Sequence, residues 1–179
     1  MGTIKATNIE PIADNGTVTL GSSGDTLTVP TGVTVAGAMA NTPSFRATLS
    51  SAQTISNATW TKVTFDTETW DTDSAFASNK FTVPSGKDGK YQFSYGGYLG
   101  SQLDQKILAF RLYKNGSAIN TTYVQQSGSG TSGEIPNACV VLSLSAADYV
   151  EVYVYQNNSA DRPLDHNYTR FEGHRLIGA

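Results

Sequence analysis

Residues 137–156 read NACVVLSLSAADYVEVYVYQ, and this stretch decides the fold. Apolar residues alternate with other residues along both halves, and a period of two places each set on one face of a β-strand. The apolar set is Val140, Leu142, Leu144, Val150, Val152 and Val154. The short polar segment Ser145–Asp148 separates the halves. The sequence therefore predicts a hairpin of two strands, with the valine face in a core.

The opposite face of the second strand carries Tyr149, Glu151, Tyr153 and Tyr155. These residues are too polar for a deep core and too aromatic for an ordinary surface. Two interpretations stay open for this tyrosine stripe. It is either ordinary sheet packing or a contact surface for another subunit or a sugar.

The composition is that of a small β-protein. The chain has 179 residues, of which 39% are hydrophobic and 15% charged, and Thr, Ser, Asn and Gly are abundant. That mix favours strands and turns over helices. The net charge of −3 argues against a nucleic-acid partner. No apolar run has the length of a signal peptide or a membrane span, so we expect no insertion into a membrane.

The first 42 residues differ from the rest. Residues 1–13 have no clear period and predict an arm or attachment segment. Residues 14–42 contain short Thr-rich strands, each with two apolar residues and each ended by Gly or Pro; the pairs are Val18/Leu20, Leu27/Val29 and Val33/Val35. Such strands cannot form a core alone, so we expect three chains to wrap around one axis as an intertwined β stem. The alternative is a flexible linker.

Aromatic residues appear after Pro43, and we place the domain boundary there, with an arm and stem at 1–42 and a head at 43–179. Strands are predicted at Phe45–Leu49, Gln53–Ile55, Trp60–Phe65, Phe81–Val83, Lys90–Tyr98, Lys106–Lys114, Ala118–Gln125 and Tyr168–Ile177, besides the two halves of residues 137–156. Loops are predicted at Asp66–Ala77, Gln126–Gly133 and Asn157–Asn167. About ten strands with no helical period indicate an all-β sandwich or jelly roll.

Cofactor and catalytic sites are not indicated. The loop residues Asp66, Glu68, Asp71 and Asp73 could bind calcium or form a solvated acidic loop, and they lack the glycine and terminal glutamate of a helix-loop-helix calcium site. Cys139 is the single cysteine, so an intrachain disulfide is not possible. Its position within a predicted strand indicates a small, buried apolar side chain. No nucleophile with a paired base is recognisable, so we expect no cofactor and no enzyme activity.

Several head motifs resemble those of a known family when taken in order. They are Phe45-x-Ala47, Phe81-Thr-Val-Pro84, Gly89-Lys-Tyr91-x-Phe93, Leu112-Tyr-Lys-Asn-Gly116, Leu142-x-Leu144 with Asp148-Tyr-Val150, and Phe171-x-Gly173-x-x-Leu-Ile177. Together they resemble the globular head of the first complement component, a tumour-necrosis-factor-like jelly roll. The resemblance covers about three quarters of the chain and implies a ten-stranded jelly roll and a tight homotrimer. Residues 1–42 lack the Gly-x-y repeat of the collagen-like stalk in that family.

The segment TLTVPTGVTVAG, residues 26–37, resembles instead the stem repeats of bacteriophage tail fibres. This resemblance implies a virion location, with the N-terminal arm bound to other virion proteins. The function that we expect first is a receptor-binding fibre protein that contacts the host surface through a trimeric head. The alternative is a decoration, head-fibre or adaptor protein without a receptor, and a glycan-processing enzyme is disfavoured because no carboxylate pair is recognisable.

The loop 157–167 is the predicted contact site, because recognition usually lies on loops of a rigid scaffold. Planar hydrogen-bonding groups beside aromatic rings suit a host glycan. The candidate residues are Tyr155, Arg162, Asp165, His166, Asn167 and Tyr168. The alternative is that the loop packs against a neighbouring subunit.

Overall fold

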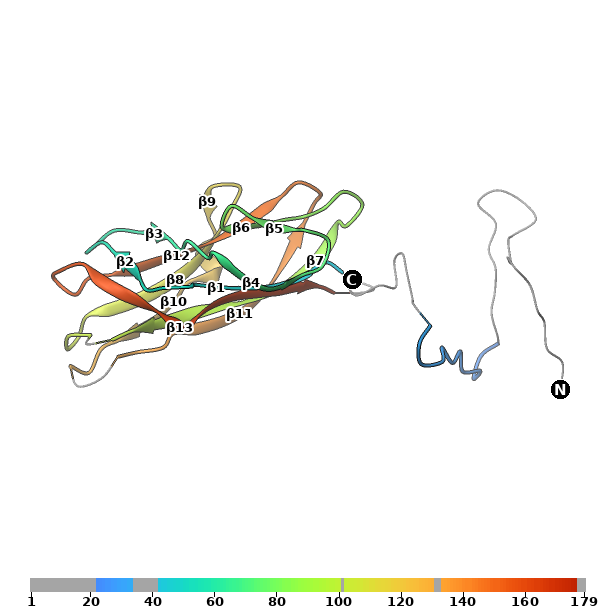
Figure 1. The fold of residues 1–179 in the computed structure, drawn as a ribbon, viewed down its shortest axis with the longest axis horizontal. Coiled ribbons are helices and arrows are strands. Elements are labelled where there is room, and N and C mark those ends of the chain that lie inside the picture. The colour runs from blue at the N-terminus through green and yellow to red at the C-terminus, as the bar shows by residue number, and fades with distance from the viewer. Residues whose placement is uncertain (1–21, 34–41, 101, 131–132, 177–179) are drawn as a thin grey trace. The chain divides into compact units, whose positions relative to one another are not determined.

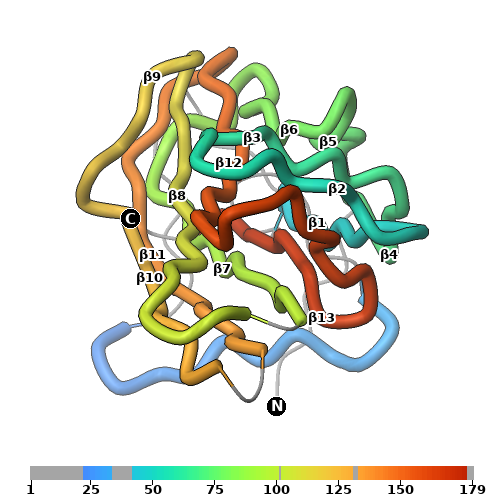
Figure 2. The backbone as a smooth tube through the Cα atoms, turned by 90° about the vertical axis from the view of Figure 1, so that its left-hand side faces the viewer, coloured from blue at the N-terminus to red at the C-terminus, as the bar shows by residue number. Residues whose placement is uncertain are grey.

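The computed structural model describes residues 22–33, 42–100, 102–130 and 133–176. These residues fall into two units, a short N-terminal piece and the head, and each is described by itself. The head consists of two antiparallel sheets (Figures 1 and 2). Among the described residues, the one helical element is the 3₁₀ turn η2 (Asn120–Thr122), and no helix could cross a membrane.

Sheet A has the strand order β11-β7-β13-β1-β4, with β2 paired to β13. Its strands are β1 (Ser44–Thr48), β2 (Gln53–Ile55), β4 (Thr67–Asp71), β7 (Gly89–Leu99), β11 (Asn137–Leu144) and β13 (Arg162–Arg175). Sheet B has the order β10-β8-β12-β6-β5, with β3 paired to β12 and β9 to β8. Its strands are β3 (Thr61–Lys62), β5 (Phe76–Ala77), β6 (Lys80–Thr82), β8 (Ile107–Lys114), β9 (Ser117–Ala118), β10 (Val124–Ser127) and β12 (Tyr149–Gln156).

This architecture confirms the all-β jelly roll. Thirteen strands are described, and β3, β5 and β9 have two residues each, which leaves ten longer strands. The side chains that the alternation assigned to the core are buried, and they include Tyr91, Phe93 and Tyr95 of β7, Leu108, Phe110 and Leu112 of β8, and Val150, Val152 and Val154 of β12. Each set faces the opposite sheet, so the core lies between the two layers.

Aromatic rings fill the centre of the core. Phe45 stacks against Phe76 and Phe81 with ring centroids 5.1 and 5.0 Å apart, and it meets Phe171 edge-on at 4.9 Å. Gly173 pairs with Phe93 across β13 and β7, and a Cβ at Gly173 would lie 2.5 Å from a carbon of that ring. The motif Phe171-x-Gly173 therefore supplies one large ring to the core and makes room for another.

Residues 137–156 do not form the predicted hairpin. β11 pairs with β7 in sheet A, whereas β12 pairs with β8, β6 and β3 in sheet B. Residues 145–148 are a corner where the chain passes from one sheet to the other. Both the corner and a hairpin need the same short polar turn, which is why the local sequence predicted the wrong partner strands. The prediction that the valine face of β12 lies in the core is confirmed.

All three predicted loops are partly strands. Residues 66–77 contain β4 and β5, and the segment predicted as a loop at 157–167 enters β13 at Arg162. β13 is long because it pairs first with β2 and then with β7, with a bulge between Asp165 and Arg170. The polar residues of its first half gave no alternating signal. The predicted loop 126–133 begins inside β10, which ends at Ser127.

Residues 22–33 of the N-terminal piece contain no strand. Turns at residues 22–25 and 30–33 are closed by backbone hydrogen bonds from Asp25 to Ser22 (3.0 Å) and from Val33 to Pro30 (3.2 Å). The apolar side chains of Leu27 and Val33 are 66% and 57% exposed. The turns lie at the Gly and Pro positions where the sequence predicted breaks between strands, and within residues 22–33 the strands expected of a stem are not formed. The other predicted stem residues, Val18, Leu20 and Val35, lie outside the described residues.

Candidate functional site

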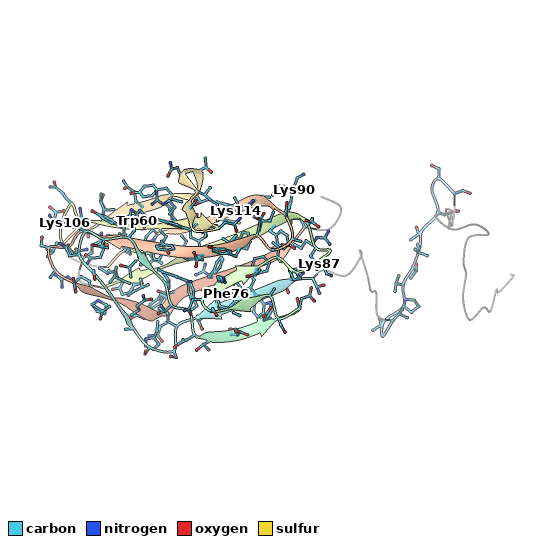
Figure 3. All side chains as sticks on the ribbon, turned by 90° about the horizontal axis from the view of Figure 1, so that it is seen from above. Trp60, Phe76, Lys87, Lys90, Lys106 and Lys114 are labelled. Carbon is cyan, nitrogen blue, oxygen red and sulfur yellow. The ribbon has the colours of Figure 1, made fainter. Side chains whose placement is uncertain are left out.

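The outward side of sheet B carries a cluster of aromatic residues around one arginine. Because Val152 and Val154 of β12 point into the core, their neighbours Tyr153 and Tyr155 point outward. Arg111 and Tyr113 likewise point outward from β8, and Arg111 is directly opposite Tyr153. We define the aromatic face as Trp60, Arg111, Tyr113, Tyr123, Tyr153 and Tyr155. All of these side chains are partly or largely exposed (Figure 3, where Trp60 is labelled).

Ring contacts connect the members of the aromatic face. The Trp60 ring lies 5.5 Å from the Tyr155 ring and 6.1 Å from the Tyr123 ring, in an edge-on arrangement with Tyr123. The rings of Tyr113 and Tyr153 are stacked with centroids 3.8 Å apart. Strand pairing fixes the backbone of Tyr113, Tyr153 and Tyr155, whereas Trp60 directly precedes β3 and Tyr123 directly precedes β10.

Arg111 connects the two groups of rings. Its guanidinium carbon lies 4.3 Å from the centroid of the Trp60 ring and 5.1 Å from that of Tyr113, which are cation–π distances. One terminal nitrogen donates to Asn120 Oδ1 (3.1 Å) and the other to the Tyr113 hydroxyl (3.0 Å). The cation is thereby held in one orientation, flat against the aromatic rings.

Ala109 makes room for this arrangement. It occupies an outward position of β8, opposite both Tyr155 and Gln125, yet it is fully buried. A methyl group at this position lets the larger neighbouring side chains cover the strand.

The phenol groups of Tyr123 and Tyr153 in the aromatic face are neutral at pH 7. Burial raises the pKa of Tyr123, and burial followed by the charge of Glu151 raises that of Tyr153. Both hydroxyls can therefore donate as well as accept hydrogen bonds.

Charged side chains extend the aromatic face along β12. Lys62 Nζ and Glu151 Oε1 form an ion pair at 2.6 Å. Lys80 Nζ lies 4.3 Å from the centroid of the Tyr149 ring. Neither Lys80 nor Arg111 has a carboxylate partner among the described residues. The face therefore carries positive charge in a chain whose net charge is −3.

The outward side of sheet A has a different character. It contains a hollow of about 360 Å³ whose lining includes Trp70, Gln92, Glu172 and His174. Trp70 is 45% exposed and Val141 of the edge strand β11 is 52% exposed. We call this surface the sheet A face. Cys139 lies on the same side of β11 and is exposed, so the prediction of a buried cysteine is wrong.

The predicted contact residues are divided between the two sheets. Tyr155 belongs to the aromatic face of sheet B, whereas the others belong to β13 of sheet A; these are Arg162, Asp165, His166, Asn167 and Tyr168. Asp165 Oδ1 accepts hydrogen bonds from the backbone and side-chain nitrogens of Asn167, at 2.7 and 3.1 Å. Tyr168 is 53% exposed and meets Tyr98 edge-on at 5.3 Å. Tyr155 and Tyr168 therefore do not flank one site.

Sequence reasoning missed Arg111, Tyr113 and Tyr123 as site residues and assigned Trp60 to packing. A signal was present, because Arg111 and Tyr113 flank the core residue Leu112 and must point outward. Nothing in the sequence placed Trp60 beside Tyr155, since that contact depends on β3 pairing with β12.

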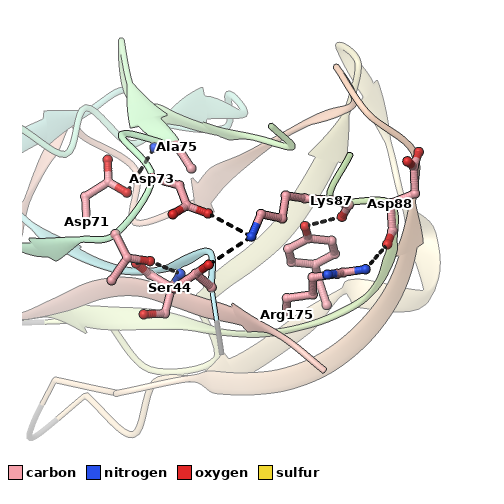
Figure 4. Close-up of polar contacts among 10 residues, drawn as sticks. Ser44, Asp71, Asp73, Ala75, Lys87, Asp88 and Arg175 are labelled. Carbon is pink, nitrogen blue, oxygen red and sulfur yellow. Dashed lines mark hydrogen bonds and ion pairs between the residues drawn. The ribbon is translucent and has the colours of Figure 1, made fainter. Parts of the chain in front are cut away.

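Three of the four carboxylates of the acidic segment 66–73, those of Asp66, Asp71 and Asp73, have separate partners. Asp66 accepts hydrogen bonds from the Ser50 hydroxyl (2.6 Å) and backbone N–H (2.7 Å), and these bonds lower its pKa. Asp71 accepts bonds from the backbone of residues 75 and 76, and Asp73 lies 3.7 Å from Lys87 Nζ (Figure 4). Among the described residues, no group of three or more His, Cys, Asp or Glu side chains could hold a metal ion.

Comparison with known proteins identifies the fold. No protein-family model matches the sequence. No curated protein matches it either. Among solved structures, the globular domain of zebrafish complement 1qA is similar, with 18% identity, a TM-score of 0.57, and coverage of 75% of this chain and 98% of that domain. Murine APRIL is also similar, with 12% identity, a TM-score of 0.56, and an alignment that covers 75% of this chain and 98% of the APRIL chain. Eiger TNF from S. frugiperda has 15% identity and a TM-score of 0.53, and its alignment covers 76% of this chain and 92% of the Eiger chain.

These likenesses define the head as a jelly roll of the type found in complement and TNF heads, as its motifs implied. At 12–18% identity they carry the fold alone. The role of the chain must therefore be argued from its two outward faces.

Proposed function

We propose that this chain is a non-enzymatic receptor-binding protein of a bacteriophage virion fibre. It forms a homotrimer whose head contacts a host-surface glycan through the aromatic face. The observation that carries this proposal is the aromatic face itself: five rings and one cation, on or directly beside the strands of sheet B and accessible to solvent. The proposal moves the predicted contact site from the segment around His166 to sheet B, with Tyr155 as the shared residue.

Aromatic rings of this kind suit sugars. A pyranose ring has an apolar face of C–H groups that stacks on an aromatic ring, while its hydroxyls need hydrogen-bonding partners nearby. Trp60 and Tyr155 supply stacking surface, and the neutral hydroxyls of Tyr123 and Tyr153 supply donors and acceptors. Tyr and Trp also bind at a low entropic cost, because each has two rotatable side-chain bonds.

The sheet A face is the proposed self-association surface, and its occupant is a second copy of the chain. An exposed tryptophan and an exposed valine on an edge strand are unfavourable in water and are typical of a subunit contact. The homotrimer implied by the resemblance to complement heads would cover such a surface. The aromatic face lies on the other sheet, so both faces can be used at once.

The virion origin is supported by the first 42 residues. The closed turns at 22–25 and 30–33 separate short Thr-rich segments whose apolar residues are exposed in the single chain. Copies of the chain around one axis would bury these residues, as in a fibre stem. The N-terminal arm then joins the stem to other virion proteins.

The test is adsorption of the purified, labelled full-length chain to a panel of bacterial strains. We expect adsorption by the wild type and by His166→Ala, and at least tenfold weaker adsorption by Trp60→Ala, because a stacking ring is lost. Light scattering at micromolar concentration should give three times the 19.0 kDa chain mass for all three proteins. Intact trimers that adsorb to no strain would refute receptor binding and favour the decoration, head-fibre or adaptor role.

A further inference from the structure

The aromatic face contains a cation that the protein itself does not neutralise. Arg111 has neutral hydrogen-bond acceptors, Asn120 and Tyr113, and no carboxylate among the described residues. The nearest carboxylate on the outward side of β12 is Glu151, which is already paired with Lys62. A partly covered cation without a counter-charge is costly, so a ligand that supplies a negative charge gains free energy.

The guanidinium also has free donors. Each terminal nitrogen carries two N–H groups and donates one of them to a protein acceptor, so each retains one for a ligand. The Nε–H is buried and has no hydrogen-bond partner in the described part of the chain. Two terminal N–H groups on a fixed planar fork suit the two oxygens of a carboxylate.

We infer that the aromatic face binds a glycan containing uronic acid, with the sugar ring stacked on the aromatic residues and its carboxylate paired with Arg111. This inference rests on the proposed function. The guanidinium carbon lies 4.3 and 5.1 Å from two ring centroids, so the anionic group must be attached close to the stacked sugar ring. In a uronic acid the carboxylate is bonded directly to a ring carbon. A phosphodiester lies in the linkage between residues and is farther from any stacked ring.

Lys80 extends the charge complementarity along the same sheet. Its ammonium lies over Tyr149, at the other end of the outward side of β12, and has no carboxylate partner among the described residues. Tyr149 and Tyr155 are six residues apart on one strand, which spans ~20 Å. An acidic chain of several sugar residues can therefore contact both cations, whereas a single monosaccharide cannot.

The test is calorimetric titration of the full-length chain with oligomers of galacturonate, glucuronate and mannuronate, each compared with its carboxyl-reduced neutral form. We expect at least one acidic oligomer to bind tenfold or more tightly than its neutral form at low salt. Arg111→Gln should lose tenfold or more of that affinity. Arg111→Lys should lose less, because it keeps the charge and loses the fork. The control Lys106→Gln removes one positive charge from a partly exposed position just before β8, outside the residues of the aromatic face and outside sheet A, and should bind as the wild type does.

Equal affinity for acidic and neutral oligomers, or no binding of any acidic oligomer, would overturn the inference. Tighter binding of poly(glycerol phosphate) than of every uronate would overturn it in favour of a phosphate ligand. The wild-type comparison needs no variant, so a variant that fails to fold does not affect it. If the chain adsorbs to cells but does not bind uronate oligomers, the proposed function is kept and the uronate inference is overturned. If it neither adsorbs to cells nor binds uronate oligomers, both the proposed function and the uronate inference are overturned.

Discussion

The corner between the two sheets depends on one carboxylate, Asp148. Its Oδ2 accepts a hydrogen bond from the backbone N–H of Ser145 (2.8 Å) and pairs with Lys114 Nζ at 2.7 Å, and its Oδ1 accepts one from Asn115 Nδ2 (2.7 Å). These bonds connect the corner at 145–148 to the neighbouring turn after β8. We expect Asp148→Asn to remove the ion pair, leave a side chain of the same shape, and destabilise the head.

The size of the effect follows from the pKa of Asp148. The hydrogen bond from Lys114, followed by those from Ser145 and Asn115, lowers this pKa from 3.8 to about 2. At ~1.36 kcal/mol per pH unit, the difference sets a ceiling of about 2.4 kcal/mol on the contribution of the charge to folding. The ion pair lies at the surface, where water screens it, so we expect about 1 kcal/mol.

The sign of the pH dependence is fixed because the folded chain binds the Asp148 proton more weakly than the unfolded chain. The stability gained from the carboxylate is complete above about pH 4 and is lost as the pH falls towards about 2. The assay is urea unfolding of wild type, Asp148→Asn, Lys114→Gln and the double variant at fixed protein concentration, from pH 7 to pH 2. The coupling between the two positions should be clear at pH 7 and much smaller at pH 2, where about half of the folded chains have Asp148 protonated. A wild-type advantage that is the same at pH 2 and pH 7 would refute this account of the corner.

Four further results are expected. Val152→Asp places an unpaired charge at a side chain that is 1% exposed, and it should prevent folding as judged by circular dichroism. Val141→Asp, on a half-exposed side chain, should fold and weaken self-association instead, as measured by light scattering. Burial raises the pKa of Tyr91 and Tyr95 to about 12, so ultraviolet titration should leave at least these two of the nine tyrosines largely protonated at about pH 11, and the free energy of unfolding should fall as they ionise. Residues 43–179 alone should give the β-sheet spectrum of the full chain, and a random-coil spectrum would refute an independent head.

The core was predictable because alternation in a strand is a local property. In β7, β8 and β12, large apolar residues occupy every second position of the core-forming part, and a pleated strand must place them on one side. The turn at residues 115–116 was predictable for a similar reason: Asn115 and Gly116 have φ angles of 50° and 77°, which these residue types tolerate. Neither inference required knowledge of the partner strand.

Partner strands could not be predicted in this way. Val140 lies opposite Phe93, and Val150 lies opposite Lys114, although the two valines are ten residues apart in the chain. The alternation is the same whether β11 and β12 pair with each other or with strands of different sheets. The aromatic face was missed for this reason, since Trp60 and Arg111 meet only through the pairing of β3 and β8 with β12.

The same stretch that decides the fold also explains why the two outward faces differ. Among the outward positions of β11, Cys139 and Val141 are apolar and exposed, and they lie between the polar residues Asn137 and Ser143. In β12 they hold Glu151, Tyr153 and Tyr155, whose polar ends can remain in water while their rings present a flat surface. Exposed apolar residues such as those of β11 gain free energy from permanent burial against another subunit. Aromatic residues with polar groups, such as those of β12, gain free energy from reversible contact with a polar ligand. Because the corner sends the two strands into opposite sheets, self-association and glycan recognition need not compete for the same side of the head.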